Sequence, residues 1–144
     1  MTPDVNVLLA ASRSDHPQHD QAYGWLKGAL EACSTGGTLE LLPMVTSGFL
    51  RIATHPKVFA QPMSSRDAVT FLRAILKIPG ASMPELGREW SGVERLCVDL
   101  ALRGNRIPDA WIAAAVSAGG YHLVTFDRGF ADLLRPSEYT LLAS

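Results

Sequence analysis

The chain has 144 residues and a formal net charge of −1, and 47% of its residues are hydrophobic while 19% are charged. This composition excludes a disordered chain and predicts one globular domain over residues 1–144, large enough to bury a core. The small net charge excludes a general attraction to nucleic acid or anionic membranes, so any RNA-binding surface must be a local patch. Cys33 and Cys97, without a C-x-x-C motif, favour reduced thiols over a disulfide or a zinc site.

The first half of the chain alternates short apolar runs with helical patterns. Residues 4–10 are short and almost wholly apolar, so their spacing does not distinguish a strand from a helix. They are also too few to span a bilayer, and no basic leader precedes them. The next expected elements are a helix that follows Pro17 and ends before Gly36-Gly37, a buried parallel strand over 39–44, and a helix over 45–54.

The second half continues the alternation. The expected elements are a helix capped by Ser64 or Ser65 and running to 76, an edge strand over 81–85, a helix from 88 with Gly104 as its C′ residue, a buried helix over 108–118, a strand over 121–126, a short helix over 130–134 and a strand over 139–142. This order predicts an α/β fold of three layers, in which helices flank a mainly parallel sheet of four to five short strands.

Three aspartates stand where such a fold gathers functional groups. Asp4 lies beside the first apolar run, Asp109 is in the first turn of the helix that follows Pro108, and Asp127 follows the strand in Y-H-L-V-T-F-D. Ligands of parallel sheets sit outside the carboxyl ends of the strands, and converging carboxylates bind divalent metal ions. Each acid also has a simpler interpretation: a solvated terminal residue, a first-turn acid that assists the helix dipole, and a turn or N-cap residue, respectively.

Other polar residues near these acids are candidates for supporting roles. Asn6 is a candidate for orienting a carboxylate, and Thr125 for offering a hydroxyl, because it points to the same side as Asp127. Arg51 and Arg106 are the best candidates for phosphate contacts. No P-loop, G-x-G-x-x-G or G-x-S-x-G motif occurs. A phosphate-transferring enzyme with Asp4 as its nucleophile is a weaker alternative, since such enzymes want an acid where Asn6 stands.

Four segments in order, D-V-N-V-L-L-A, S-G-F-L-R-I-A-T-H-P-K-V-F, G-N-R-I-P-D-A-W-I-A-A-A and T-F-D-R-G-F, resemble the PIN-domain ribonucleases, and most of all the VapC-type toxins of type II toxin–antitoxin pairs. The resemblance implies a PIN-like fold and a metal-dependent endoribonuclease that cleaves single-stranded or loop RNA. Asp4, Asp109 and Asp127 would hold one or two Mg²⁺ or Mn²⁺ ions, which prefer such oxygen ligands. The resemblance further implies a homodimer silenced by a VapB-like antitoxin, and the exposed faces of the helices around Tyr23–Leu30 and Phe71–Leu76 are candidate contacts. The lack of a basic leader and of a bilayer-length apolar run predicts a cytoplasmic location.

The chain departs from the family pattern at two acidic positions. Gly48 stands where the family usually has a Glu, and Gly129 stands where many members have a second acid, with Asp132 as a possible replacement. The lost charge predicts weaker metal binding, completed by an RNA phosphate, and leaves open a degenerate PIN domain that binds RNA or protein without cleavage. The family's first strand is central and ends at the residue matching Asp4. We therefore expect a very short first strand here, containing Pro3, which lacks an N–H for the ladder.

Overall fold

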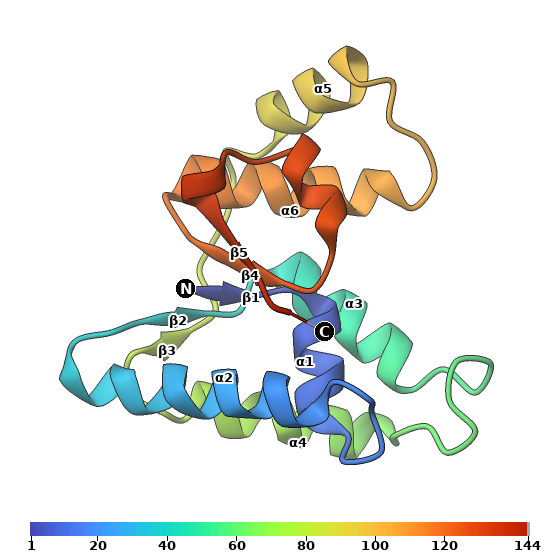
Figure 1. Cartoon of the computed structure of the whole chain (residues 1–144), viewed down its shortest axis with the longest axis vertical. Helices are drawn as coiled ribbons and strands as arrows, with labels where there is room; N and C mark the ends of the chain where they lie inside the picture. Colours follow the sequence, from blue (N-terminus) through green and yellow to red (C-terminus); the bar gives the residue numbers. More distant parts are fainter. Residues whose placement is uncertain (144) are drawn as a thin grey trace.

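The computed structural model describes residues 1–143 as short parallel strands between helices (Figure 1). The strands are β1 (Thr2–Pro3), β2 (Leu39–Glu40), β3 (Ala81–Ser82), β4 (Leu123–Thr125) and β5 (Tyr139–Leu141). The helices are α1 (Val5–Ser12), α2 (His19–Ala32), α3 (Pro43–Ala53), α4 (Ser65–Leu76), α5 (Trp90–Asp99) and α6 (Arg106–Gly119). Three short 3-10 helices are η1 (Cys33–Thr35), η2 (Arg128–Asp132) and η3 (Pro136–Glu138).

Every strand pairing is parallel. One sheet has the order β1-β4-β5 and the other pairs β2 with β3. The N–H of Glu40 donates to the carbonyl of Met1 over 3.0 Å, which places β2 beside the free edge of β1. Figure 1 shows α5 and α6 on one side of the strands and α2 and α4 on the other. The predicted three-layer α/β fold with a parallel sheet is therefore confirmed.

The first strand is as short as expected, and a side-chain hydrogen bond replaces the backbone bond that its proline cannot donate. The N–H groups of Thr2 and Asp4 donate to β4, to His122 over 2.8 Å and to Val124 over 2.9 Å. Pro3 therefore faces β2, where a regular parallel ladder would need its missing N–H. The hydroxyl of Thr2 donates instead to the carbonyl of Glu40 over 2.6 Å, and Thr2 is fully buried. A side chain thus replaces one backbone donor at the centre of the fold.

Several element boundaries differ from the sequence expectation. Residues 5–12 are helical, which resolves the ambiguous first run. The strand expected over 39–44 ends at Glu40, because Pro43 begins α3 in the first helical position, where its missing N–H costs nothing. Ser64 caps α4 as expected, and its hydroxyl accepts from the N–H of Asp67 over 3.0 Å.

Two helix ends were predicted wrongly. Helix α5 stops at Asp99, and Ala101, with φ of 50°, is the left-handed residue that closes it, while Gly104, with φ of 58°, lies farther along the loop. The N–H of Leu102 then donates to the carbonyl of Cys97, which is the hydrogen bond of a Schellman motif at the end of a helix. Helix α6 begins at Arg106, two residues before the predicted start, so Pro108 is its third residue. That position still lies in the first turn, where the backbone N–H groups have no partner within the helix.

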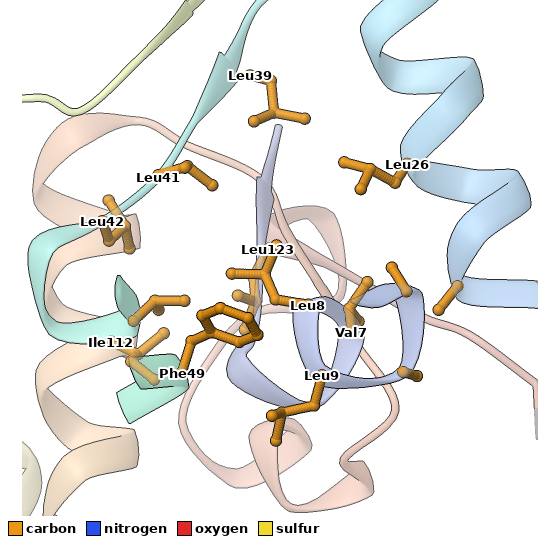
Figure 2. Packing of buried hydrophobic residues seen from close by; sticks show 14 of the residues in the cluster. Val7, Leu8, Leu9, Leu26, Leu39, Leu41, Leu42, Phe49, Ile112 and Leu123 are labelled. Carbon is orange, nitrogen blue, oxygen red and sulfur yellow. The ribbon is translucent and has the colours of Figure 1, made fainter. Parts of the chain in front are cut away.

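One apolar core joins the layers. Figure 2 shows side chains converging from α1, α2, β2, α3, α6 and β4, and the labelled residues are Val7, Leu8, Leu9, Leu26, Leu39, Leu41, Leu42, Phe49, Ile112 and Leu123. The ring of Phe71 on α4 lies 5.5 Å from the ring of Phe49, so that side of α4 packs inward. None of the helices in residues 1–143 combines the length and hydropathy that a membrane span requires.

Candidate metal-binding active site

The three predicted aspartates line one pocket of about 890 Å³. Asp4 reaches it from the start of α1, Asp109 from the first turns of α6, and Asp127 from two residues beyond the end of β4. The pocket therefore lies beyond the carboxyl ends of β1 and β4, where a parallel sheet places its ligands. Asn6, Gly48 and Arg51 also line it, whereas Thr125 and Arg106 do not.

Asp4 is buried and held from two sides. It is the N-cap of α1, and its Oδ1 accepts the N–H of Val5 over 2.7 Å. Its Oδ2 accepts the hydroxyl of Thr125 over 2.6 Å, although the two residues are 121 positions apart. Burial raises the pKa of the Asp4 carboxyl, the two hydrogen bonds oppose that rise, and the charge of Asp127 adds to it. The interpretation of Asp4 as a solvated terminal acid is therefore wrong.

Asp109 carries the clearest electrostatic signature. Desolvation, followed by the negative charges of Asp127 and Asp4, raises its pKa to about 6, and the Arg106 guanidinium opposes the rise. The mutual repulsion shows that the three carboxylates act on one another across the pocket. Such crowding of negative charge is what a bound cation would relieve.

Asp127 caps the short 3-10 helix η2, as the simpler interpretation predicts, and it also lines the pocket. Its Oδ1 accepts the N–H of Gly129 over 2.8 Å, and its own N–H donates to the hydroxyl oxygen of Thr125 over 2.9 Å. The Nδ2 of Asn6 donates to the same hydroxyl oxygen over 3.4 Å, and its Oδ1 accepts from the N–H of Phe126. Hydrogen bonds of Thr125 thus connect Asp4, Asn6 and Asp127.

Arg106 is held behind the acids and does not line the pocket. Its Nη2 donates to the carbonyl of Gly129 over 3.0 Å, and its Nε lies 3.7 Å from Oδ2 of Asp109, beyond hydrogen-bonding distance. That Nε is buried and finds no hydrogen-bond partner within residues 1–143. A Cβ at position 129 would lie 2.8 Å from Nη1, so the absence of a side chain there makes room for the guanidinium. The geometry favours charge compensation of Asp109 over a direct phosphate contact.

The positions where the family has further acids are filled differently. A Cβ on Gly48 would lie 2.9 Å from Cγ2 of Val5, so α3 approaches α1 more closely there than a larger residue allows. Asp132 is exposed and does not line the pocket, which excludes it as the replacement for an acid at Gly129. Arg51 is exposed on α3 and does line the pocket, as a phosphate contact must.

The donor set suits a hard cation, but the ligands are not preassembled. The acidic and amide side chains that line the pocket offer oxygen ligands, which Mg²⁺ and Mn²⁺ prefer, and no thiol or imidazole lines it. Within residues 1–143, however, no three His, Cys, Asp or Glu side chains converge closely enough to form a metal cluster. An ion would therefore need movement of these side chains, or oxygens from water and phosphate, to complete its coordination.

Much of the pocket wall is apolar, which sequence reasoning did not predict. The apolar lining residues include Leu9, Met44, Ile52, Val58, Ile107 and Trp111. Trp111 was visible in the motif P-D-A-W-I-A-A-A only as part of an apolar helix. Its place two residues after Asp109 is the signal that links it to the pocket.

The comparisons with known proteins agree with this geometry. The model of the PIN domain matches residues 1–135. Ribonuclease VapC43 of Mycobacterium tuberculosis is 35% identical over 133 residues, covering 92% of this chain and 88% of that protein. Ribonuclease VapC31 of the same species is 35% identical over 131 residues, covering 89% of each.

A solved structure has the same fold at low sequence identity. It is VapBC2 from Rickettsia felis bound to a DNA fragment from their promoter, with a TM-score of 0.69, 16% identity and coverage of 99% of this chain and 98% of that one. The family match over nearly the whole chain and the VapC relatives together settle the resemblance first noted in the motifs: the chain belongs to the PIN domain family, in its VapC ribonuclease group.

Proposed function

We propose that this chain is a metal-dependent endoribonuclease, the toxin of a toxin–antitoxin pair, that cleaves single-stranded or loop RNA. The observation that carries the proposal is the convergence of Asp4, Asp109 and Asp127 on one pocket, with the pKa of Asp109 raised to about 6 by burial and by the other two acids. VapC relatives named as ribonucleases support the reaction class. Membership of the PIN family leaves no support for the phosphatase alternative.

The three aspartates would hold Mg²⁺ or Mn²⁺. When bound, such an ion supplies an activated water and a counter-charge for the scissile phosphate. Asp4 is kept in place by Val5 and Thr125, so its orientation does not depend on the ion. Asn6 and Thr125 act as positioning residues, and Arg51 is placed to contact a phosphate of the bound RNA.

An antitoxin of the VapB kind would be the partner, as the name of the structural relative suggests. Part of the expected contact surface is available on α2, where Tyr23 is 52% exposed and lines a shallow groove with Leu26, Leu30 and Ile78. The complex would assemble as a homodimer of the toxin in the cytoplasm, where its RNA substrate is found.

A second candidate function is a PIN domain that binds RNA without cutting it. Two observations favour it: Gly48 has no acid and no room for one beside Val5, and no ready metal cluster occurs within residues 1–143. The two candidates differ in one property, which is whether the aspartates support cleavage when metal is supplied.

The test is cleavage of a mixed RNA pool in Mg²⁺ or Mn²⁺, using protein freed of antitoxin. Wild type is compared with Asp109→Asn and with Asp132→Asn, an exposed aspartate outside the pocket. We expect metal-dependent cuts with wild type and Asp132→Asn, and a loss of at least 100-fold, as an order-of-magnitude estimate, with Asp109→Asn.

Thermal unfolding with Mn²⁺ provides an independent measurement. Metal held by the aspartates should raise the melting temperature of wild type and raise it less for Asp127→Asn. Folded wild-type protein that binds RNA but cuts none in either metal would overturn the nuclease proposal in favour of the binding-only PIN domain.

A further inference from the structure

A pair of tryptophans stands beside the acids and has no role in the chemistry described so far. Trp111 on α6 lines the pocket together with Asp109. Trp90 on α5 packs against it, with ring centroids 6.0 Å apart and an interplanar angle of 38°. The indole of Trp90 is 60% exposed, which is unusual for so large an apolar group.

The surroundings of Trp111 are apolar while the floor of the same pocket is acidic. Met44 and Ile52 from α3 and Ile107 from α6 line the pocket with it. A phosphodiester chain bound at the acids has no use for such a wall, because its phosphates need cations and polar donors. The bases of the same RNA suit an apolar wall, because each offers a flat π surface that stacks on aromatic rings.

We propose that Trp111, supported by Trp90, forms a nucleobase-binding subsite in which an unpaired base of the substrate stacks while its phosphate lies at the aspartates. This subsite rests on the proposed function, and it explains how the protein would select its RNA substrate. A base within a duplex is stacked on its neighbours and cannot enter, so the subsite selects single strands and loops. Arg51 in the same pocket supplies positive charge for the adjoining phosphate.

The ordinary explanation of Trp111 is that it only joins α5 to α6, which pack together extensively. That explanation accounts for the contact with Trp90. It does not account for the part of Trp111 that lines an open pocket beside three carboxylates. The two explanations differ in what happens when bases are removed from the RNA, and that difference defines the experiment.

The experiment measures binding of single-stranded RNA to the Asp109→Asn protein, which is not expected to cut it. The probes are an oligoribonucleotide of about eight nucleotides and the same backbone with abasic riboses. Binding is followed by tryptophan fluorescence and by anisotropy of a labelled strand in Mg²⁺. We expect the base-bearing strand to quench fluorescence and to bind about tenfold more tightly than the abasic one.

The variants assign that difference to Trp111. Trp111→Leu should remove most of the difference in affinity between base-bearing and abasic RNA. Trp111→Phe should keep that difference, because phenylalanine still stacks. Trp90→Ala, at an exposed position, should reduce it with less risk to folding. Trp25→Phe is the matched control, since Trp25 packs against the core from α2 and does not line the pocket. The dependence of affinity on salt should be the same for Trp111→Leu and its parent, because stacking releases no counterions.

Three outcomes would overturn the subsite. Equal affinity of the parent for base-bearing and abasic RNA would remove it, and so would a folded Trp111→Leu protein with unchanged RNA affinity. A Trp111→Leu protein that loses a co-expressed antitoxin while keeping RNA affinity would assign this wall to a protein partner. Failure of the proposed function is distinguishable, because wild type would then cleave no RNA in Mg²⁺ or Mn²⁺.

Discussion

At the scale of single residues, the site has fewer acidic side chains than the family pattern. Gly48 and Gly129 carry no side chain, and the guanidinium of Arg106 occupies the space beside Gly129. Asp109 therefore meets two like charges across the pocket and one opposite charge at 3.7 Å. The consequence is a carboxyl group whose ionisation is less favourable than that of an ordinary aspartate in the metal-free protein.

The pH dependence of stability follows from that carboxyl. Its pKa is about 6 in the folded protein and 3.8 ordinarily, so the folded state binds the proton more tightly. The contribution of Asp109 to the free energy of unfolding must then fall as pH rises from about 4 to 6, and stay lower above. Asp109→Asn should therefore stabilise the metal-free protein at pH 8 by about 1 kcal/mol, after allowance for solvent screening of this partly exposed group.

The measurement is thermal unfolding in EDTA across pH 4 to 8. The gain in melting temperature of Asp109→Asn should shrink toward zero at the acidic end, where wild type is protonated. Asp132→Asn, at an exposed position, should show no such pH-dependent gain. A mutant that is less stable than wild type at pH 8 would contradict the charge assignment.

Replacing Arg106 is expected to change metal affinity and stability in opposite directions. Replacing it by Gln removes a positive charge near Asp109 and a donor to the carbonyl of Gly129. Affinity for Mn²⁺ should rise roughly fivefold, because the cation no longer meets a like charge. Stability without metal should fall, because the carboxylate loses its counter-charge.

Calorimetric titration with Mn²⁺ and unfolding in EDTA measure the two effects. Arg66→Gln, on the exposed side of α4, is the control and should change neither. Weaker Mn²⁺ binding by Arg106→Gln would mean that the guanidinium holds the ligands in place and does not compete with the ion.

At the scale of elements, a strand of only two residues has the largest consequence. Strand β1 has two residues, yet it lies between β2 and β4 and its end positions Asp4. Pro3 removes one backbone donor from this central place, and the hydroxyl of Thr2 replaces it. The contact between the two sheets therefore combines the backbone bond from Glu40 to Met1 with the side chain of Thr2.

Thr2→Val tests that dependence, because it keeps the shape and removes the hydroxyl. The carbonyl of Glu40 would lose its donor in a buried place, at a cost of about 1–3 kcal/mol. Thr38→Val removes an exposed hydroxyl that donates to the side chain of Glu40, and should cost less than about 0.5 kcal/mol. Urea unfolding compares them, and equal stabilities would show that Glu40 does not depend on Thr2.

Sequence reasoning predicted the elements better than their ends. The apolar spacing found every helix from α2 to α6, because a buried face at period 3.6 is visible in the chain itself. The end of α5 was missed since a left-handed alanine, Ala101, does what the nearby Gly104 was expected to do. The first run was ambiguous because a short helix buried on nearly all sides has no polar face to reveal its period.

The candidate site was predicted in part for a similar reason. Aspartates at strand ends and helix starts can be recognised from their positions in the sequence, and Asp4, Asp109 and Asp127 do line one pocket. The place of Arg106 behind the acids and the apolar wall with Trp111 depend on how α6 packs against its neighbours. No local pattern contains that information, because it arises from contacts between residues far apart in the chain.

At the scale of the whole molecule, the two ends of the chain build the same layer. Strand β1 pairs with β4, and β4 pairs with β5, so the first and last elements are joined in one sheet (Figure 1). The intervening residues form the helices that cover it and the edge strands β2 and β3. The acids accordingly come from opposite ends of the sequence and meet only in the finished fold.

The bond from Thr125 to Asp4 across 121 positions has a consequence during synthesis. A nascent chain emerging from the ribosome carries Asp4 first, and Thr125 and Asp127 follow only near the end of translation. Until β4 has emerged and paired with β1, the acids cannot share a pocket. On the proposed function, the active site is completed only as translation ends, and a chain interrupted before β4 would lack Thr125 and Asp127 and would therefore be inactive.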